Sequence, residues 1–458
     1  MKLFNTIIFL AFSILTFGQS KQDKELLKQV DKTISDNFYN FAPGCQVLIA
    51  KKGQIIYEKG YGTANLELNV PMSSEMVFRI GSITKQFTAI SILQLVDKGQ
   101  IALTDSIQKF IKDFHFNGKK ITIENLLTHT SGIKGYEQID AKVPNAIRVD
   151  FLSKTIIDSL AKLTLEFEPN TKYNYSNSNF FLLGYIIEQV SGKTYQQYLK
   201  ENIFEPAGLN STYYDSQTQI IPYRTNGYSF SDGKYLNTDF ISMSLVYSAG
   251  ALLSNVSDLF KWHQALYNGQ IIKKEIFLKA ITPYILADGK QIDYGYGFFI
   301  RNENGIRSIG HGGAIDGFRA TEIYYPDQDI YVACLLNSDK DNEAKLFQSI
   351  ANIALGIKAD QQVQEIKLSG YILSKYVGTY KNYKNNVSIK IYRANDRIYG
   401  DLSNGTGSNL MFMALTETNF LLPDITRVKT VADFVIDNGK VTKLILTQEQ
   451  PVDFIKIE

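Results

Sequence analysis

The alternation of hydrophobic and polar positions divides the chain into a helical middle and strand-rich flanks. Apolar residues at helical spacing predict a helix over residues 21–38, and residues 45–61 predict two strands joined by a tight turn. Longer runs with helical periodicity and glycine stops predict mainly helices over residues 82–210. Strand patterns return over residues 294–337, and a final helix ends at Gly356.

Strands at both ends of this region, with helices inserted between them, predict an α+β fold. We expect an antiparallel sheet flanked by helices, plus an all-helical region. The pattern then changes. Alternation over residues 387–391 predicts a strand buried on one face, and Asn438 and Gly439 between two apolar runs are a strong hairpin signal. We therefore predict a first domain over residues 21–358 and a small C-terminal all-β domain, a barrel or a sandwich, over residues 361–458.

The first residues have the pattern of an export signal. Lys2 precedes an apolar run over residues 3–17, and the small residues Thr16 and Gly18 are placed for cleavage. Because the run is short and polar residues follow at once, we predict a signal peptide over residues 1–18, with an uncleaved anchor as the alternative. No later segment has the roughly 18 apolar residues of a membrane span. The expected mature protein is periplasmic or secreted, with no membrane span after signal cleavage.

Composition narrows the classes of function. The net charge is +2 and the sequence contains no basic block, so no nucleic-acid partner is expected. The four histidines show no pairing at metal-ligand spacing, so we expect no metal site and no cofactor. The two cysteines, Cys45 and Cys334, lie in strand-like runs and are interpreted as buried thiols, with a disulfide between them as the alternative.

The stretch RIGSITKQFTAI places a serine three residues before a lysine where an apolar helix begins. Ser82 and Lys85 share one face of the first helical turn. One interpretation is a capped helix, because serine is a favoured N-cap, but Lys85 then opposes the positive end of the helix dipole. Spacing alone does not select a functional serine, because the same pattern recurs at Ser106, Ser131, Ser159 and Ser231.

Two further motifs follow in order along the chain. Tyr175 and Asn177 lie in a polar loop immediately before an amphipathic helix, and His311 and Gly313 form the only H-x-G, on a late strand. This order of S-x-x-K, Y-x-N and H-x-G, together with LLTHTSG and IFEPAGLNST, resembles the serine β-lactamase-like superfamily. That superfamily includes penicillin-binding DD-peptidases, class C β-lactamases and related esterases. The C-terminal region is similar to the small β domain often appended to such hydrolases.

The resemblance covers roughly residues 25–356 and implies catalysis through an acyl-enzyme. Ser82 is then the nucleophile. Lys85, if burial holds it neutral, or Tyr175, or the two as a coupled pair, is the base. The backbone N–H groups of Ser82 and Ala314 are the oxyanion hole expected by analogy with the family.

The same resemblance assigns the substrate-binding residues. Asn177 is expected to orient a substrate amide. His311 and Gly313 are expected to line the opposite wall, with His311 contacting a substrate carboxylate or the Tyr175 network. Many penicillin-recognising enzymes have K-T-G or K-S-G at this position, and the histidine here weakens the interpretation as a dedicated β-lactamase.

The expected function is an exported serine hydrolase that acts on a small-molecule or peptide substrate. D-Ala-D-Ala-like peptides, D-amino-acid amides and small esters are the expected substrates, which makes the protein a carboxypeptidase, an amidase or an esterase. A β-lactamase is one alternative. A non-catalytic protein that binds cell-wall peptide is another, although a binder has no need of all three motifs.

Several residues near these motifs are assigned to structure instead of chemistry. Ser131 lacks an apolar helix behind its lysine, and it is rejected as the nucleophile. His129 is expected to bond nearby backbone groups. The aromatic residues assigned to the core are Trp262, Tyr294, Tyr296, Phe298 and Phe299.

Overall fold

The structure, a computed structural model, describes most of the chain. The described residues are 21–35, 42–112, 114, 118–136, 146–231, 234–303, 305–340, 343–357, 365–384, 386–394, 396–403, 410–422, 430–447 and 451–457. The predicted signal peptide over residues 1–18 and the predicted boundary near residue 360 lie outside them. Within the described residues, no helix combines the length and the apolar character that crossing a bilayer requires.

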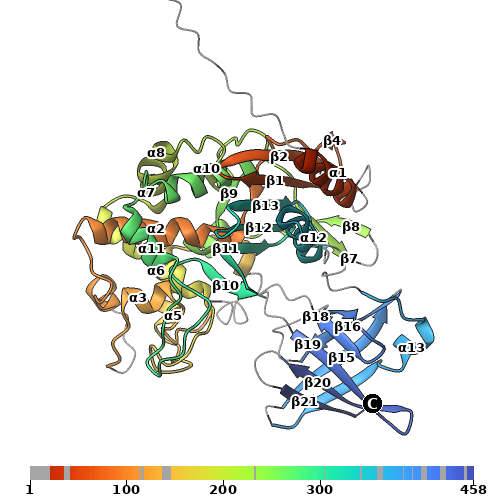
Figure 1. The fold of residues 1–458 in the computed structure, drawn as a ribbon. Helices are drawn as coiled ribbons and strands as arrows, with labels where there is room; N and C mark the ends of the chain where they lie inside the picture. The colour runs from red at the N-terminus through yellow and green to blue at the C-terminus, as the bar shows by residue number, and fades with distance from the viewer. Residues whose placement is uncertain are drawn as a thin grey trace, which may run out of the picture.

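A six-stranded antiparallel sheet forms the centre of the larger body, in the order β10-β11-β12-β13-β1-β2. The strands are β10 Phe299–Glu303, β11 Ile306–Ile315, β12 Phe318–Tyr325, β13 Ile330–Leu336, β1 Cys45–Lys51 and β2 Gln54–Tyr61. The N-terminal β1 lies beside the late β13, with Cys45 opposite Leu336 (Figure 1). The two strand-rich flanks predicted from the sequence therefore join into one sheet.

Helices cover both faces of this sheet. Successive residues of its central strands point to opposite sides, so each face contributes to a separate core. Leu48 belongs to one core and Val47 to the other. The helices in the first core include α2 Thr84–Asp97 and α10 Val256–Tyr267, and those in the second are α1 Lys21–Ser35 and α12 Glu343–Leu355. Burial on both sides explains the apolar run over residues 47–50 of β1 and the continuous apolar run of β13.

The middle of the chain is mainly helical, as predicted. Its other helices are η1 Gly81–Ile83, η2 Ile107–Lys109, α3 Ile123–Leu127, η3 Ala146–Arg148, α5 Ser153–Leu160, α6 Asn177–Ser191, α7 Tyr195–Leu199, η4 Lys200–Phe204, α8 Glu205–Ala207, α9 Met243–Val246, η5 Tyr247–Ala249 and α11 Lys274–Ala280. Its short strands are β3 Thr63–Asn65, β4 Val70–Pro71, β5 Phe78–Arg79, β6 Tyr213–Tyr214, β7 Tyr228–Ser231, β8 Lys234–Asn237 and β9 Leu252–Ser254.

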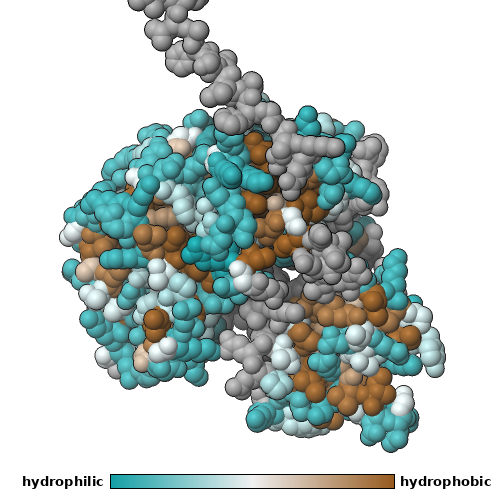
Figure 2. Space-filling view, viewed as in Figure 1, coloured by the Kyte–Doolittle hydropathy of each residue, from teal (hydrophilic) through white to brown (hydrophobic). Residues whose placement is uncertain are grey.

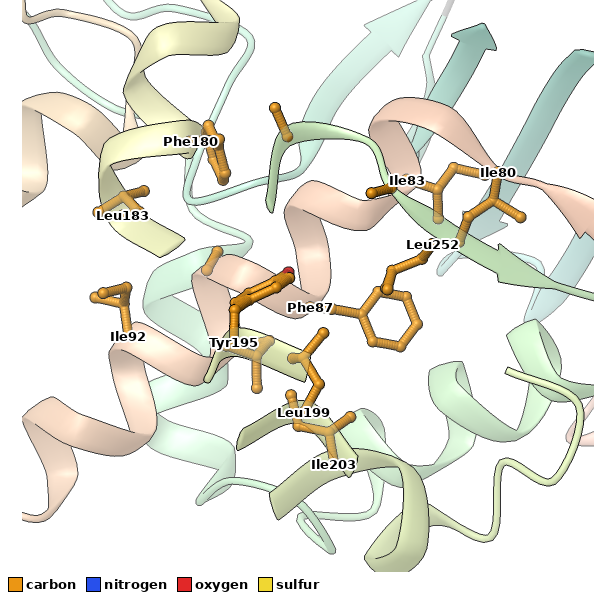
Figure 3. Packing of buried hydrophobic residues seen from close by; sticks show 14 of the residues in the cluster. Ile80, Ile83, Phe87, Ile92, Phe180, Leu183, Tyr195, Leu199, Ile203 and Leu252 are labelled. Atoms are coloured by element: carbon orange, nitrogen blue, oxygen red, sulfur yellow. The ribbon is translucent and has the colours of Figure 1, made fainter. Parts of the chain in front are cut away.

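Helix α2 lies at the centre of this helical region. Its residues from Thr84 to Leu95 are all buried, including several polar ones. Figure 3 shows Phe87 of α2 close to Leu252 of β9 and to Leu199 at the end of α7. A helix surrounded on every side holds its side chains in fixed positions.

The C-terminal region forms a closed eight-stranded barrel. Its strands are β14 Gly378–Asn382, β15 Val387–Ala394, β16 Arg397–Leu402, β17 Leu410–Ala414, β18 Asn419–Leu422, β19 Thr430–Asp437, β20 Lys440–Thr447 and β21 Pro451–Lys456, preceded by α13 Gly370–Ser374. Pairing of β14 with β21 closes the ring, so the small β region is a barrel and not a sandwich. Asn438 and Gly439 both have positive φ at the β19–β20 turn, as the predicted hairpin requires.

The barrel interior is filled with aromatic and aliphatic side chains. Phe434 lies 4.4 Å from Tyr376 between ring centres, and Phe412 and Phe420 complete the aromatic cluster. Hydrophobic residues also reach the barrel surface, as Figure 2 shows. In the larger body, the two cysteines are buried and form no disulfide, which confirms the interpretation as buried thiols.

Candidate active site

Five of the residues predicted for the site line a single cavity of about 790 Å³. They are Ser82, Tyr175, His311, Gly313 and Ala314. Ser82 lies in η1, the short turn before α2, and neither helix has Ser82 as its N-cap. The structure therefore does not have the serine cap that was the alternative interpretation, and the half-buried Ser82 side chain faces the cavity instead.

Lys85 lies directly behind Ser82 and is completely buried. Its Nζ is 2.8 Å from Ser82 Oγ. It is also 2.8 Å from Asn177 Oδ1 and 2.8 Å from the carbonyl oxygen of Ala249. The first turn of α2, the start of α6 and the end of η5 thus meet at one amine.

These three contacts limit what the amine is able to do. The carbonyl oxygen of Ala249 and the amide oxygen of Asn177 only accept hydrogen bonds. A neutral amine has two N–H bonds for these two acceptors, and its lone pair then faces the hydroxyl of Ser82. This geometry suits a nucleophile-and-base pair of the kind that serine chemistry requires, with two further groups orienting the amine.

Tyr175 lies on the same side of the cavity. Lys85 Nζ is 4.9 Å from the centre of the Tyr175 ring. Helix α6 begins two residues later at Asn177, so one short segment supplies both a cavity-lining phenol and the amide that contacts Lys85. Asn177, which was expected to orient a substrate amide, is absent from the cavity lining formed by the described residues, and its Oδ1 contacts Lys85.

Strand β11 forms the opposite wall and approaches the serine turn closely. A Cβ atom at Gly313 would lie 1.9 Å from the carbonyl oxygen of Ile80 and 3.1 Å from Ser82 N. A Cβ at Gly81 would lie 3.0 Å from Ala314 N. Only glycine at position 313 permits this close approach between strand β11 and the serine turn, and Ser82 and Ala314 both line the cavity.

His311 is held by partners on both ring nitrogens. Nδ1 is 2.5 Å from the carbonyl oxygen of Gly312, which only accepts, so Nδ1 carries a proton. Nε2 is 3.2 Å from the hydroxyl of Tyr294. Burial, followed by the neighbouring Tyr175 and Tyr173, raises the pKa of Tyr294 well above its ordinary value, so this phenol stays protonated and donates to Nε2.

The His311 ring is 6.1 Å from the Tyr175 ring between centres, close enough to line the same cavity. Its nitrogens, however, are directed to Gly312 and Tyr294. The predicted contact of His311 with the Tyr175 network includes this ring contact.

A buried polar chain behind the site was not predicted from the sequence. Trp262 Nε1 donates to Gln86 Oε1 at 3.0 Å, and Gln86 Nε2 donates to Glu322 Oε1. The same Glu322 oxygen accepts the backbone N–H of His311 at 3.2 Å. This chain connects the residue after Lys85 to strand β11. The signal for it was a single acidic residue in the apolar run FRATEIYY.

The outer cavity wall is aromatic and charged. Phe299 lines it, although the sequence assigned this residue to the core, and the Arg301 guanidinium lies 4.3 Å from the Phe299 ring centre. The other three aromatic residues of that group, Tyr294, Tyr296 and Phe298, are buried as predicted, and so is Trp262. The remaining charged residues of the wall are Lys172, Asp288, Lys290 and Asp293.

Ser131 and His129 lie behind this site. Ser131 is buried, donates to Asn179 Oδ1 at 2.6 Å and is not part of the cavity lining formed by the described residues. His129 is buried and contacts backbone, as predicted. Among the described residues, no group of three or more His, Cys, Asp or Glu side chains is placed to hold a metal ion.

Comparison with known proteins gives one consistent family. A family model described as Beta-lactamase matches residues 37–355. The chain is 29% identical over 402 residues to a penicillin-binding protein of Bacillus subtilis (strain 168), covering 82% of this chain and 87% of the relative. It is 25% identical over 345 residues to a D-aminopeptidase of Brucella anthropi, covering 75% of this chain and 64% of the relative.

A solved structure shares the fold over nearly the whole chain. The octameric penicillin-binding protein homologue from Pyrococcus abyssi superposes with a TM-score of 0.67 at 27% identity, covering 94% of this chain and 99% of that chain. The similarity thus extends into the C-terminal region.

Proposed function

The chain belongs to the β-lactamase family of serine hydrolases, and from that premise we propose that it is an exported hydrolase that forms an acyl-enzyme on Ser82. The observation that carries the proposal is the 2.8 Å contact between Lys85 Nζ and Ser82 Oγ at the wall of the cavity. Export to the periplasm or secretion is supported by the signal-peptide pattern over residues 1–18.

In the acylation step, the neutral amine of Lys85 takes the proton from the Ser82 hydroxyl as Oγ attacks the carbonyl carbon of the substrate. The two N–H bonds of the amine remain on Ala249 O and Asn177 Oδ1. The charge that develops on the carbonyl oxygen is stabilised by the N–H groups of Ser82 and Ala314, a contribution of about 3–4 kcal/mol per donor in comparable sites.

The tetrahedral intermediate then breaks its bond to the leaving group, which takes up a proton from Tyr175 or from the Lys85 ammonium. Proton transfer of this kind contributes roughly 10²–10⁴-fold to a rate. In the second half of the cycle, water attacks the acyl carbon, loses a proton to the same pair, and releases the acid with Ser82 restored.

We propose D-Ala-D-Ala-like peptides, D-amino-acid amides or small esters as substrates. The similarity to a D-aminopeptidase supports the D-amino-acid class. The cavity of about 790 Å³ has room for a short peptide, and its polar and aromatic walls suit one. His311, at the position where many penicillin-recognising enzymes carry lysine, speaks against a dedicated β-lactamase.

The proposal is tested by labelling with a fluorescent fluorophosphonate. We expect the wild type to be labelled, S82A to lose the label, and S131A to retain it. Ser131 is a matched control, because it has the same S-x-x-K spacing and lies nearby without facing the cavity. Labelling that survives in S82A refutes the assignment of the nucleophile.

A substrate panel separates the alternatives. Release of D-alanine from a D-Ala-D-Ala peptide, or turnover of D-alanine p-nitroanilide or p-nitrophenyl acetate, supports the peptidase, amidase or esterase. Fast turnover of nitrocefin identifies a β-lactamase. Stoichiometric binding of cell-wall peptide, with no turnover of any ester, identifies a non-catalytic binding protein.

A further inference from the structure

His129 lies immediately after α3 and packs behind Tyr175. Its side chain is completely buried, and its backbone has a φ of 56°, in the left-handed region. Few residue types other than glycine adopt this conformation, although asparagine, aspartate and histidine do so more often than most. The residue therefore has an unusual backbone in a place that does not face the cavity, which calls for a reason.

The contacts of His129 bracket Tyr175 on both sides along the chain. The backbone N–H of Asn174 donates to the carbonyl oxygen of His129 at 3.0 Å. The backbone N–H of Ser176 donates to His129 Nδ1 at 3.2 Å. The residues directly before and after Tyr175 are thus both fixed by the same histidine.

Two further contacts extend this hold. Asn179, in the first turn of α6, places its side-chain amide nitrogen 3.2 Å from the same Nδ1. The His129 ring lies 4.3 Å from the Tyr175 ring between centres, at an angle of 36°. His129 therefore contacts Tyr175 itself as well as the segment that carries it.

Both side-chain hydrogen bonds of His129 involve its Nδ1. Because Nδ1 accepts from a backbone N–H, it carries no proton, and the proton of the neutral ring is on Nε2. Nε2 finds no hydrogen-bond partner among the residues that the structure describes. Burial holds the pKa of His129 well below its ordinary value, which keeps Nδ1 available as an acceptor.

We propose that His129 is a positioning residue that fixes the Tyr175 phenol beside Lys85 through the acceptor Nδ1. The inference rests on the proposed acyl-enzyme on Ser82, because it concerns the proton transfers of that mechanism. His129 touches no reacting atom, and its effect on turnover passes through Tyr175.

The test is a double-mutant cycle with p-nitrophenyl acetate as the substrate. H129F removes the acceptor and keeps an aromatic ring, and Y175F removes the phenol. We expect H129F to lower kcat about 100-fold with KM changed less than about threefold, since proton transfer contributes 10²–10⁴-fold. In the Y175F background, H129F should lower kcat by less than about threefold, because residues that act as a unit are not additive.

H129N is the conservative variant. Asparagine tolerates the left-handed backbone and supplies an oxygen acceptor near the position of Nδ1. We expect it to keep kcat within about tenfold of the wild type. H129N also serves as the test if H129F does not fold. A decrease in kcat for H129N as large as that for Y175F would overturn the role of Nδ1.

H263F is the matched control. His263 packs against Tyr267 and Tyr324 at 4.4 and 4.5 Å between ring centres, in a cluster outside the cavity. We expect the same change there to leave kcat within about twofold in both backgrounds. If H129F lowers kcat by the same factor in the wild-type and Y175F backgrounds, the inference is overturned. A wild type with neither Ser82 labelling nor ester turnover refutes the proposed function instead.

Discussion

The larger body and the C-terminal barrel both bury aromatic side chains, but they treat buried charge differently. Among the described residues, every buried charged or imidazole side chain lies in the larger body: Arg79, Lys85, His129, Asp215, Asp258, His311 and Glu322. The barrel core contains tyrosines whose hydroxyls donate to carbonyl oxygens, Tyr376 to Glu417 and Tyr380 to Tyr376. Those contacts satisfy polar groups without burying a charge.

The two regions therefore differ in whether they contain buried charged groups that lower the stability of the fold. Burying a charge costs several kcal/mol unless it is paired and hydrogen-bonded, and it is tolerated where a function needs it. Three of these residues lie at the cavity: Lys85 contacts Ser82, His311 lines the cavity wall, and Glu322 accepts the backbone N–H of His311. In the barrel, the pair of Lys443 with Asp453 lies on the surface, where such pairs contribute little.

We expect the largest effect from removing the buried amine of Lys85, which tests most directly whether the buried charges of the larger body serve its site. We expect K85M to lower the rate of Ser82 labelling by fluorophosphonate by at least about 10⁴-fold, because the hydroxyl loses its base. The thermal unfolding temperature should not fall, since the methionine chain fills the same space. The barrel control is K456M, whose half-buried amine donates to the carbonyl oxygen of Lys375. We expect K456M to be labelled at the wild-type rate. Slow labelling of K456M would contradict the difference between the larger body and the barrel.

Two aspartates sharpen the comparison in terms of stability. Asp215 is buried and pairs with Arg79 at 2.8 Å and with Arg224 at 2.6 Å. We expect D215N to lower the free energy of unfolding by about 3–5 kcal/mol, because Arg79 remains buried without its counter-charge. In the barrel, Asp453 pairs with Lys443 on the surface, and D453N should cost less than about 1 kcal/mol. Urea unfolding measures both, and equal losses would remove the distinction.

Within the cavity, Gly313 and Gly312 provide the next contrast. A Cβ at position 313 would lie 1.9 Å from Ile80 O, whereas at position 312 the nearest atom is 3.7 Å away. We expect G313A to lower the Ser82 labelling rate about 10²–10³-fold by displacing the Ala314 N–H. G312A should keep the wild-type unfolding temperature. A G313A variant that labels normally would show that this close approach does not matter.

The smallest expected effect concerns pH. Burial lowers the pKa of His263 to about 3, against about 6.5 in the unfolded chain. Below pH 6.5, His263 binds a proton in the unfolded chain but stays neutral in the folded protein. The free energy of unfolding is therefore unaffected by this residue above pH 6.5 and falls as the pH drops below it. We expect the free energy of unfolding to fall by about 1–2 kcal/mol between pH 7 and pH 5 on account of this residue.

H263F should remove that part of the acid sensitivity. Residues 361–458 contain no histidine, so the barrel should keep its stability over the same range. Hydrogen exchange of the whole protein, pre-equilibrated at each pH and labelled in a pulse at one fixed pH, resolves the two regions. Equal acid losses in barrel and body would contradict the prediction.

The sequence predicted the features that depend on local pattern. The strand-like runs predicted at Cys45 and Cys334 are β1 and β13, and the Asn438-Gly439 turn has the positive φ angles that those residues favour. The order of three motifs placed Ser82, Tyr175 and His311 in one cavity, with Lys85 at the serine.

The remaining features depend on contacts between distant segments. Ala249 contributes a backbone carbonyl, so its side chain carries no signal for the contact with Lys85. Phe299 lies in an aromatic run whose other members are buried, and only the packing decides which one faces the cavity. His129 looked structural because its partners, Ser176 and Asn179, are far along the chain.

The pairing of β1 with β13 has a consequence for how the newly made chain folds. Asn337 accepts a hydrogen bond from the backbone N–H of Gly44, 293 positions earlier, beside that strand pair. At ribosomal speeds of about 5–20 residues per second, the first strand waits roughly 15–60 seconds for its neighbour to be synthesised. During that time its apolar edge is open to other chains, and such non-local pairing also forms slowly. Until β13 has been made, the edge of β1 that faces it in the folded protein therefore lacks its partner strand.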